Sequence, residues 1–326
     1  MRIVVIGLGS MGKRRIRLLK QNFLEAEVYG IDNNSERRVF CQEEYGIIGY
    51  SSFEVALKAE KFDCAFVCTP PLSHNAIIRK CLQNGINVFT EINLVSDGYE
   101  ENLKLANEKK LSLFLSSTMI YRDEMQYIYE KVKNICQPVS YQYHVGQYLP
   151  DWHPWESYKD FFVGEKRTNG CREILTIELP WLTRTFGEIC EIKVMRTKLT
   201  KLQIDYDDCY MILLKHKSGN AGMFMVELAA REAVRDFKLI GEEIFVCWNG
   251  TPEGLVCKNI QEGYIEQIDL YRDIQKEKQY NKTIVENSYV NEMKHFFGEL
   301  EGRMCKTYGF EDDLKVLRII DQIEKE

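Results

Sequence analysis

Apolar residues in the first 120 positions of this chain fall into short continuous runs, separated by stretches with the spacing of an amphipathic helix. The runs cover residues 2–7, 27–32, 64–69, 87–91 and 111–117. Continuous apolar runs of this length are typical of parallel strands that are covered on both faces. One face of the first intervening stretch carries Gly12, Ile16, Leu19 and Phe23. This alternation predicts an α/β domain with a doubly wound parallel sheet over residues 1–120.

The pattern changes after about residue 120. A helical stretch at 122–134 leads to a strand-like run at 140–147, and several more strand-like runs follow between 188 and 269. The segment K-S-G-N at 217–220 separates two of these runs and is typical of a hairpin turn. Two helices are expected near 287–302 and 311–324. Residues 121–326 therefore predict a second, α+β domain with an open mixed or antiparallel sheet.

Composition narrows the class of protein. The length of 326 residues fits two domains of roughly 150 residues each. The net charge of -6 and the absence of a long basic run argue against nucleic acid as a partner. No apolar run reaches the roughly 18 residues of a membrane span. The 11 cysteines form no C-x-x-C pair, so we expect a reduced cytoplasmic protein with no bound metal.

The first apolar run ends in the glycine spacing G-x-G-x-x-G. Its glycines allow a tight turn, a close approach of backbone to a pyrophosphate and close packing of helix on strand, and an acidic residue follows 20 positions later at the end of the second strand. Amides at the start of the helix would hold the phosphates. The residues expected at a dinucleotide from this segment are Gly7, Gly9, Ser10, Met11, Gly12, Asp32 and Asn33.

Asp32 would accept hydrogen bonds from the adenosine ribose and repel a 2′-phosphate, which favours NAD over NADP. Arg37 and Arg38 follow Asp32 and could affect the choice between NAD and NADP. The alternative interpretation is that they lie on the solvated face of a helix. Thr69, Pro70 and Pro71 end another strand, where open sheets place their ligands. His74 follows them and is either a surface residue in a first helical turn or a polar group near the cofactor.

Five segments together resemble the Gfo/Idh/MocA family of oxidoreductases, which includes glucose–fructose oxidoreductase and inositol dehydrogenase. The segments read GLGSMGKRR, DNNSERR, TPPLSH, GINVFTE and YVNEMKHFF. The resemblance covers the N-terminal domain, and in the second domain it rests on the order of elements. It implies a Rossmann domain, NAD or NADP, a sugar or cyclitol substrate, and a homodimer or homotetramer built through an open sheet.

Two departures from the family pattern concern the chemistry. The family carries Glu-Lys-Pro after the fifth strand, and its lysine assists catalysis, whereas this chain has Glu91, Ile92 and Asn93. The role of the lysine cannot be carried over to Ile92. Glu91 and Asn93 could still form hydrogen bonds near the nicotinamide ribose.

The second departure lies in the helix that follows T-N-G at 168–170, where the family has an Asp and a His four residues apart. Counting from Gly170 places these on Ile174 and Glu178, whereas counting from the later F-G-E places them on Glu173 and Ile177. Glu178 falls at the centre of the apolar face of the helix, where a carboxylate is costly unless it is paired or faces a site. Glu178 is therefore the preferred candidate base, and Glu173 is a candidate substrate contact. The alternative is a structural ion pair of Glu178 with Arg122 or Arg172.

An aromatic loop offers further candidates for a substrate site. Trp152 and Trp155 flank His153, and aromatic faces suit sugar rings, while a histidine can act as acid or base near neutral pH. An aromatic plug is the alternative interpretation. Tyr121 and Arg122 follow the last strand of the first domain, where the family carries polar residues that contact substrate. The expected catalytic residues are Glu178, His153 and Tyr121, and the expected substrate contacts are Trp152, Trp155, Arg122 and Glu173.

Two hypotheses about function follow. The first is an NAD-dependent oxidoreductase that transfers a hydride between nicotinamide and an alcohol carbon of a sugar or nucleotide-sugar. A redox-neutral variant would oxidise and then re-reduce the same sugar. The second is a non-catalytic regulatory protein that binds NAD or sugar, because both the lysine and the histidine of the family are missing.

Overall fold

The computed structural model describes residues 1–154, 156–275 and 283–325. The chain divides into two compact units. The first unit consists of residues 1–117 and 292–314, and the second of residues 118–291 and 315–326. The boundaries between the units fall inside the two C-terminal helices, α8 (Asn287–Leu300) and α9 (Phe310–Ile323). Each of these helices therefore contributes residues to both units.

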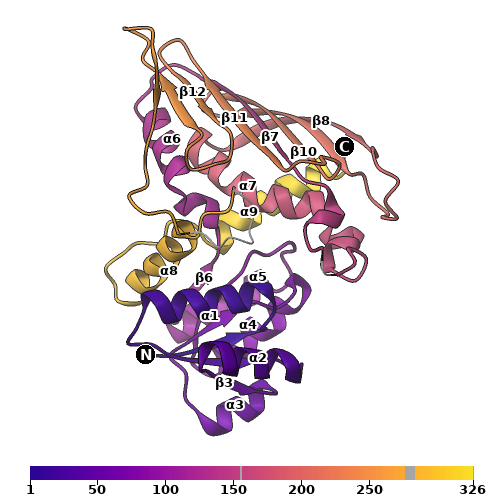
Figure 1. The fold of residues 1–326 in the computed structure, drawn as a ribbon, viewed down its shortest axis with the longest axis vertical. Helices are drawn as coiled ribbons and strands as arrows, with labels where there is room; N and C mark the ends of the chain where they lie inside the picture. Colours follow the sequence, from indigo (N-terminus) through magenta and orange to yellow (C-terminus); the bar gives the residue numbers. More distant parts are fainter. Residues whose placement is uncertain (155, 276–282, 326) are drawn as a thin grey trace. The chain divides into compact units, whose positions relative to one another are not determined.

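The first unit contains a parallel six-stranded sheet in the order β3-β2-β1-β4-β5-β6. Its strands are β1 (Arg2–Ile6), β2 (Glu27–Ile31), β3 (Ile48–Tyr50), β4 (Cys64–Val67), β5 (Asn87–Thr90) and β6 (Leu113–Leu115). The helices that connect them are α1 (Ser10–Asn22), α2 (Ser35–Tyr45), α3 (Phe53–Ala59), η1 (Pro71–Ser73), α4 (His74–Gln83) and α5 (Tyr99–Lys109). The predicted doubly wound sheet is confirmed (Figure 1). Strand β3 was not predicted, because this three-residue edge strand is partly exposed and has no apolar run.

Aromatic packing forms the core of this unit on one face of the sheet. The rings of Phe66, Phe89 and Phe114, on three adjacent strands, stack at centroid distances of 4.5 and 5.1 Å. Phe296 of α8 contacts all three rings from above. The C-terminal segment therefore completes the core of the first unit.

The second unit contains an eight-stranded sheet in the order β14-β13-β12-β11-β7-β10-β9-β8. Its strands are β7 (Ser140–Gly146), β8 (Ile189–Thr197), β9 (Cys209–His216), β10 (Ala221–Glu227), β11 (Val234–Ile240), β12 (Phe245–Trp248), β13 (Leu255–Lys258) and β14 (Ile265–Gln267). Only β7 and β10 pair in parallel, so the predicted mixed sheet is confirmed. Its helices are η2 (Thr118–Tyr121), α6 (Asp123–Lys133), η3 (Leu149–Asp151), η4 (Phe162–Gly164), η5 (Lys166–Thr168) and α7 (Gly170–Phe186).

The two faces of this sheet differ. Helix α7 lies against one face of the sheet (Figure 1). On this face the ring of Trp181 contacts those of Tyr143 and Phe237. On the opposite face Met195, Leu213 and Met223 remain more than half exposed. Within the described part of the chain, no helix combines the length and the apolar character needed to cross a membrane.

Candidate functional site

The glycine turn after β1 has the backbone geometry of a phosphate-binding loop. Gly7 has a φ of 92°, and a Cβ on Gly12 would lie 1.9 Å from the carbonyl oxygen of Gly7, so neither position tolerates a side chain. At Gly9 the nearest atom to an added Cβ is Arg37 Nη1 at 3.9 Å. Open space above Gly9 is what a pyrophosphate at this turn requires.

The start of α1 leaves its amides available. Gly9 is the N-cap and provides no side-chain acceptor, and the first turn contains no acidic residue. The first amides of a helix have no partner within the helix and carry its positive dipole end. An anion is therefore the natural partner of the amides from Ser10 to Gly12.

The end of β2 presents Asp32 beside this turn. Its Oδ2 accepts a hydrogen bond from the amide of Leu8 at 2.8 Å, and its Oδ1 accepts one from the amide of Asn34, also at 2.8 Å. Arg37 and Arg38 lie at the start of α2, the helix on which they were expected. Arg37 Nη1 is 3.7 Å from Asp32 Oδ2, and Arg38 donates to the carbonyl oxygen of Asp32. The carboxylate is thus held in place by backbone amides and lies close to a cation.

The segment after β4 is tied to the segment after β5 by His74. Its ring is 2% exposed, and its nitrogens lie 2.7 Å from the carbonyl oxygen of Thr69 and 2.7 Å from Oδ1 of Asn93. His74 begins α4, as one of its two interpretations expected, but it is not a surface residue. Burial lowers the pKa of His74 below its ordinary value. A neutral imidazole in this place joins two loops at the carboxyl ends of neighbouring strands. Pro70 and Pro71 lie between Thr69 and His74 in the first of these loops.

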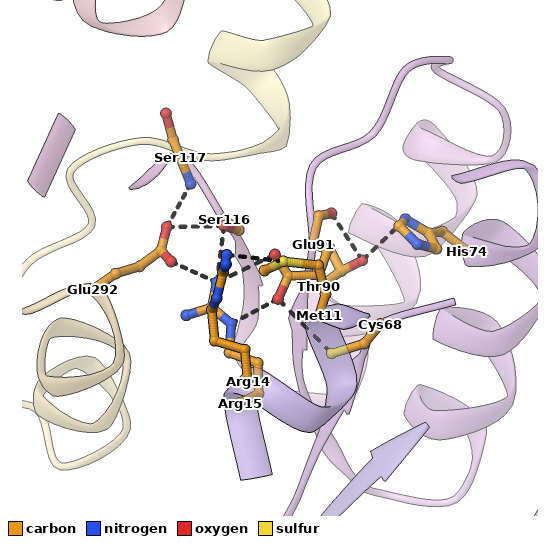
Figure 2. Close-up of polar contacts among 10 residues, drawn as sticks. All are labelled: Met11, Arg14, Arg15, Cys68, His74, Thr90, Glu91, Ser116, Ser117 and Glu292. Atoms are coloured by element: carbon orange, nitrogen blue, oxygen red, sulfur yellow. Dashed lines mark hydrogen bonds and ion pairs between the residues drawn. The ribbon is translucent and has the colours of Figure 1, made fainter. Parts of the chain in front are cut away.

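Glu91 takes part in a buried network around Arg15 (Figure 2). Arg15 is fully buried and donates to Glu91 Oε1 at 2.6 Å and to Glu292 Oε2 at 2.8 Å. Glu292 also accepts bonds from the hydroxyl of Ser116 and the amide of Ser117. Burial raises the pKa of Glu292, whereas the positive charge of Arg15 opposes that rise. One arginine thus joins α1, the end of β5 and α8.

In the second unit, Glu178 lies on α7 and is completely buried, as its central position on the apolar face predicts. Its Oε2 accepts hydrogen bonds of 2.8 Å from the hydroxyl of Tyr143 and from Nε1 of Trp181. Its Oε1 is ion-paired with Arg235 of β11. The carboxylate of Glu178 therefore has donors at both oxygens.

Glu178 does form an ion pair, but the expected partners, Arg122 and Arg172, were wrong. Arg122 forms a two-pronged ion pair with Glu124, and Arg172 pairs with Asp321 and Glu324. Arg122 also donates to the carbonyl oxygens of Thr283 and Gly250, so its guanidinium is engaged in structural contacts.

Glu173 differs from Glu178 although both are on α7. Its Oε2 is buried and has no hydrogen-bond partner among the described residues. Burial raises the pKa of Glu173 to about 8. The side chain as a whole is partly exposed. A carboxyl group of this kind can hold or release a proton near neutral pH.

The remaining candidates lie on separate elements. His153 follows η3, and its Nδ1 is 2.7 Å from Glu156 Oε1, while its ring packs on Phe161. Trp152 donates from Nε1 to the carbonyl oxygen of Gln147. Tyr121 is buried in η2. Trp155 lies outside the described residues.

Three residues of these networks were missed in the sequence: Arg15, Glu292 and Arg235. Each is a charged residue within an apolar pattern, since Glu292 precedes Phe296 by one helical turn and Arg235 alternates with Phe237 along β11. That pattern was available as a signal. The identity of each partner was not, because the pairs are far apart in the sequence.

The fold and the glycine turn define a class of protein: a chain with a Rossmann domain suited to a dinucleotide, followed by a domain with an open mixed sheet. Residues 1–116 match the Gfo/Idh/MocA model, described as an oxidoreductase family with an NAD-binding Rossmann fold. This match confirms, over residues 1–116, the resemblance noted from the sequence.

Among curated proteins, the chain is similar to biliverdin reductase A of Mus musculus, with 30% identity over 132 residues. The match covers 40% of this chain and 44% of the relative, so it spans less than half of that protein's length.

Solved structures share the whole fold. An oxidoreductase from Agrobacterium radiobacter, in complex with NAD+, L-tartaric acid and magnesium, has a TM-score of 0.81 at 14% identity, covering 98% of this chain and 94% of that one. The WlbA dehydrogenase from Bordetella pertussis, in complex with NADH and UDP-GlcNAcA, has a TM-score of 0.79 at 16% identity, covering 99% and 95%. At these identities the likeness establishes the fold.

Proposed function

We propose that this chain is an NAD(P)-dependent oxidoreductase. The observation that carries the proposal is the turn at Gly7, Gly9 and Gly12, which has room above Gly9 and uncapped amides at the start of α1. Asp32, anchored by two backbone amides at the edge of this turn, supports a preference for NAD, because a carboxylate accepts ribose hydroxyls and repels a 2′-phosphate.

The proposed substrate is an alcohol carbon of a sugar or nucleotide-sugar. The WlbA dehydrogenase, whose structure holds UDP-GlcNAcA, supports this choice through the shared fold. The hydride passes between that carbon and C4 of nicotinamide, and the hydroxyl proton must pass to a base. Ile92 cannot accept it, since its side chain is a hydrocarbon.

Two carboxylates on α7 compete for the role of base. Glu178 is fully enclosed and has donors at both oxygens, so its contacts suit it to positioning Arg235 and Tyr143. Glu173 has an oxygen without a donor and a pKa raised by burial to about 8. These properties support Glu173 as the group that exchanges the proton, with Glu178, His153 and Tyr121 as further candidates to be compared.

The test uses the full chain with NAD+ or NADP+ and a panel of sugars and UDP-sugars, followed by absorbance in the reduced-nicotinamide band. Glu173→Gln should reduce kcat by about a hundredfold or more, as loss of a general base does, while the Kd for NAD stays unchanged. Glu178→Gln tests the other carboxylate candidate on the same helix. If Glu178→Gln abolishes turnover and Glu173→Gln does not, the assignment passes to Glu178.

A second candidate activity is reduction of a linear tetrapyrrole. The similarity to a biliverdin reductase over 132 residues, together with the hydrocarbon at Ile92, favours including it. Biliverdin with NADH or NADPH is therefore the discriminating assay: a loss of reduced cofactor there, with no reaction on the sugars, selects the second activity. Binding of NAD without turnover on either panel would select the non-catalytic regulatory alternative.

We further propose that the open face of the second sheet contacts a second copy of this chain. Met195, Leu213 and Met223 form an exposed apolar strip across β8, β9 and β10. Such strips on a soluble surface mark interaction sites, and family resemblance implies assembly through this sheet. Sedimentation should show a homodimer or homotetramer, and Met223→Lys should shift it to monomer; a monomeric parent protein refutes the contact.

A further inference from the structure

The second unit contains a cleft that has no candidate site residue in its lining. It has a volume of about 420 Å³ and is bordered by the end of α6, the segment 135–139, the end of α7 and the turn at 218–220. All of its lining residues belong to the second unit. None of them is among the residues expected to bind cofactor or substrate.

The charge of this cleft is entirely positive. Lys133 and Arg184 line it, and no Asp or Glu does, although the chain as a whole has a net charge of -6. Arg184 stacks on the ring of Tyr129 with its guanidinium carbon 4.8 Å from the ring centroid. This cation–π contact holds the guanidinium near the ring.

The location of Lys133 and Arg184 at the ends of helices accounts for their positive charge. It does not account for the one nitrogen of Arg184 that has no acceptor in the described part of the chain. Lys133 and Arg184 each lie in the last turn of a helix, where basic side chains complement the negative end of the dipole. However, Nη1 of Arg184 is buried and donates to no acceptor among the described residues. The carbonyl oxygen of Phe186 does not fill this role, because it already accepts bonds from Ser218 Oγ and Asn220 Nδ2.

A buried guanidinium nitrogen without an acceptor is costly unless a ligand supplies one. A planar guanidinium matches the oxygens of phosphate and carboxylate groups in a two-pronged geometry. Two cations in a cleft lined by no carboxylate suit a dianion better than a monoanion. The volume also exceeds what a bare oxyanion needs and falls in the range of small-molecule sites, about 300–1,000 Å³.

We propose that this cleft binds the phosphate group of a small phosphorylated metabolite, with Arg184 and Lys133 contacting the phosphate oxygens. None of the residues that line this cleft is among those proposed for the oxidoreductase activity.

The test is calorimetry on the full chain with glycerol 3-phosphate as the probe and glycerol as the uncharged comparison. Glycerol 3-phosphate should bind and glycerol should not, and inorganic phosphate should compete if the phosphate group dominates recognition. Arg184→Gln should weaken binding by about tenfold or more, as expected for loss of a hydrogen bond to a charged group.

Lys133→Gln provides a second variant that is safe for folding, because Lys133 is exposed. It should weaken binding severalfold. Lys131→Gln is the matched control: Lys131 lies on the same helix, is also exposed and also faces a tyrosine ring, but it does not line the cleft. Unchanged affinity in both Arg184→Gln and Lys133→Gln would place the phosphate elsewhere, for instance at the glycine turn, and overturn the proposal. Absence of binding by the parent protein would overturn it as well.

Discussion

Replacing Arg15 by methionine tests whether the buried network around it stabilises the nucleotide-binding unit. Methionine keeps much of the side-chain volume of arginine. It removes the positive charge that pairs with Glu91 and Glu292. Both carboxylates then lose a cation in a place where Glu292 is inaccessible to water and Glu91 nearly so. The change therefore creates a buried electrostatic imbalance without a large cavity.

The expected cost follows from the partners that remain. Breaking a buried ion pair by removing one partner costs about 3–5 kcal/mol. Glu292 keeps two donors, the hydroxyl of Ser116 and the amide of Ser117, which moderates the loss. We therefore expect the low end, about 3 kcal/mol, and with a urea dependence of about 3 kcal/mol/M the midpoint should fall by about 1 M.

Urea unfolding with two probes is the assay. Far-UV circular dichroism reports both units, whereas all four tryptophans lie between residues 152 and 248, so their fluorescence reports the second unit. The loss should be larger in the dichroism transition. It should also shrink between pH 8 and pH 5: the pKa of Glu292 is already raised in the folded state, removal of Arg15 raises it further, and a raised carboxyl pKa costs stability as pH rises through it.

The triple variant Arg15→Met, Glu91→Gln, Glu292→Gln is the control, because it also removes the two negative charges that Arg15 contacts. It should recover most of the lost stability. A single variant with an unchanged midpoint at pH 8, or a triple variant no more stable than the single one, would refute the account of the network as a paired buried cluster.

Three further changes test the dinucleotide site and its surroundings. Gly12→Ala should abolish NAD binding in calorimetry, since its Cβ would lie 1.9 Å from the carbonyl oxygen of Gly7; retained affinity would contradict the turn geometry. Asp32→Ser should weaken NAD by about tenfold and narrow the preference over NADP, measured as the ratio of the two Kd values; an unchanged ratio would remove Asp32 from cofactor choice. Burial lowers the pKa values of His74 and His216, so protons bind better to the unfolded chain and stability falls as pH drops below about 6.5. His74→Gln should flatten that decline in thermal melts, with His216→Gln as the counterpart in the second unit, and an equally steep decline would show that other groups cause it.

Local chemistry explains which features could be predicted from the sequence. The strands of the first sheet are apolar on both faces, and the turn at Gly7 and Gly12 needs glycine for steric reasons, so both leave marks within a few residues. The edge strand β3 has neither property and was missed. The burial of Glu178 was also predictable, because helical periodicity alone places it on the apolar face.

The partners of buried charges required the fold. Arg15 and Glu292 are 277 positions apart, and Glu178 and Arg235 are 57 apart, so no local pattern connects them. A buried carboxylate on a helix is compatible with a catalytic base and with an ion pair, and the difference depends on what the opposite strand presents. In β11 the alternation of Arg235, Phe237 and Leu239 places the arginine on the covered face. Searching apolar alternations for a single charge of opposite sign would therefore have identified Arg235 as a candidate partner, even though it could not have chosen among several.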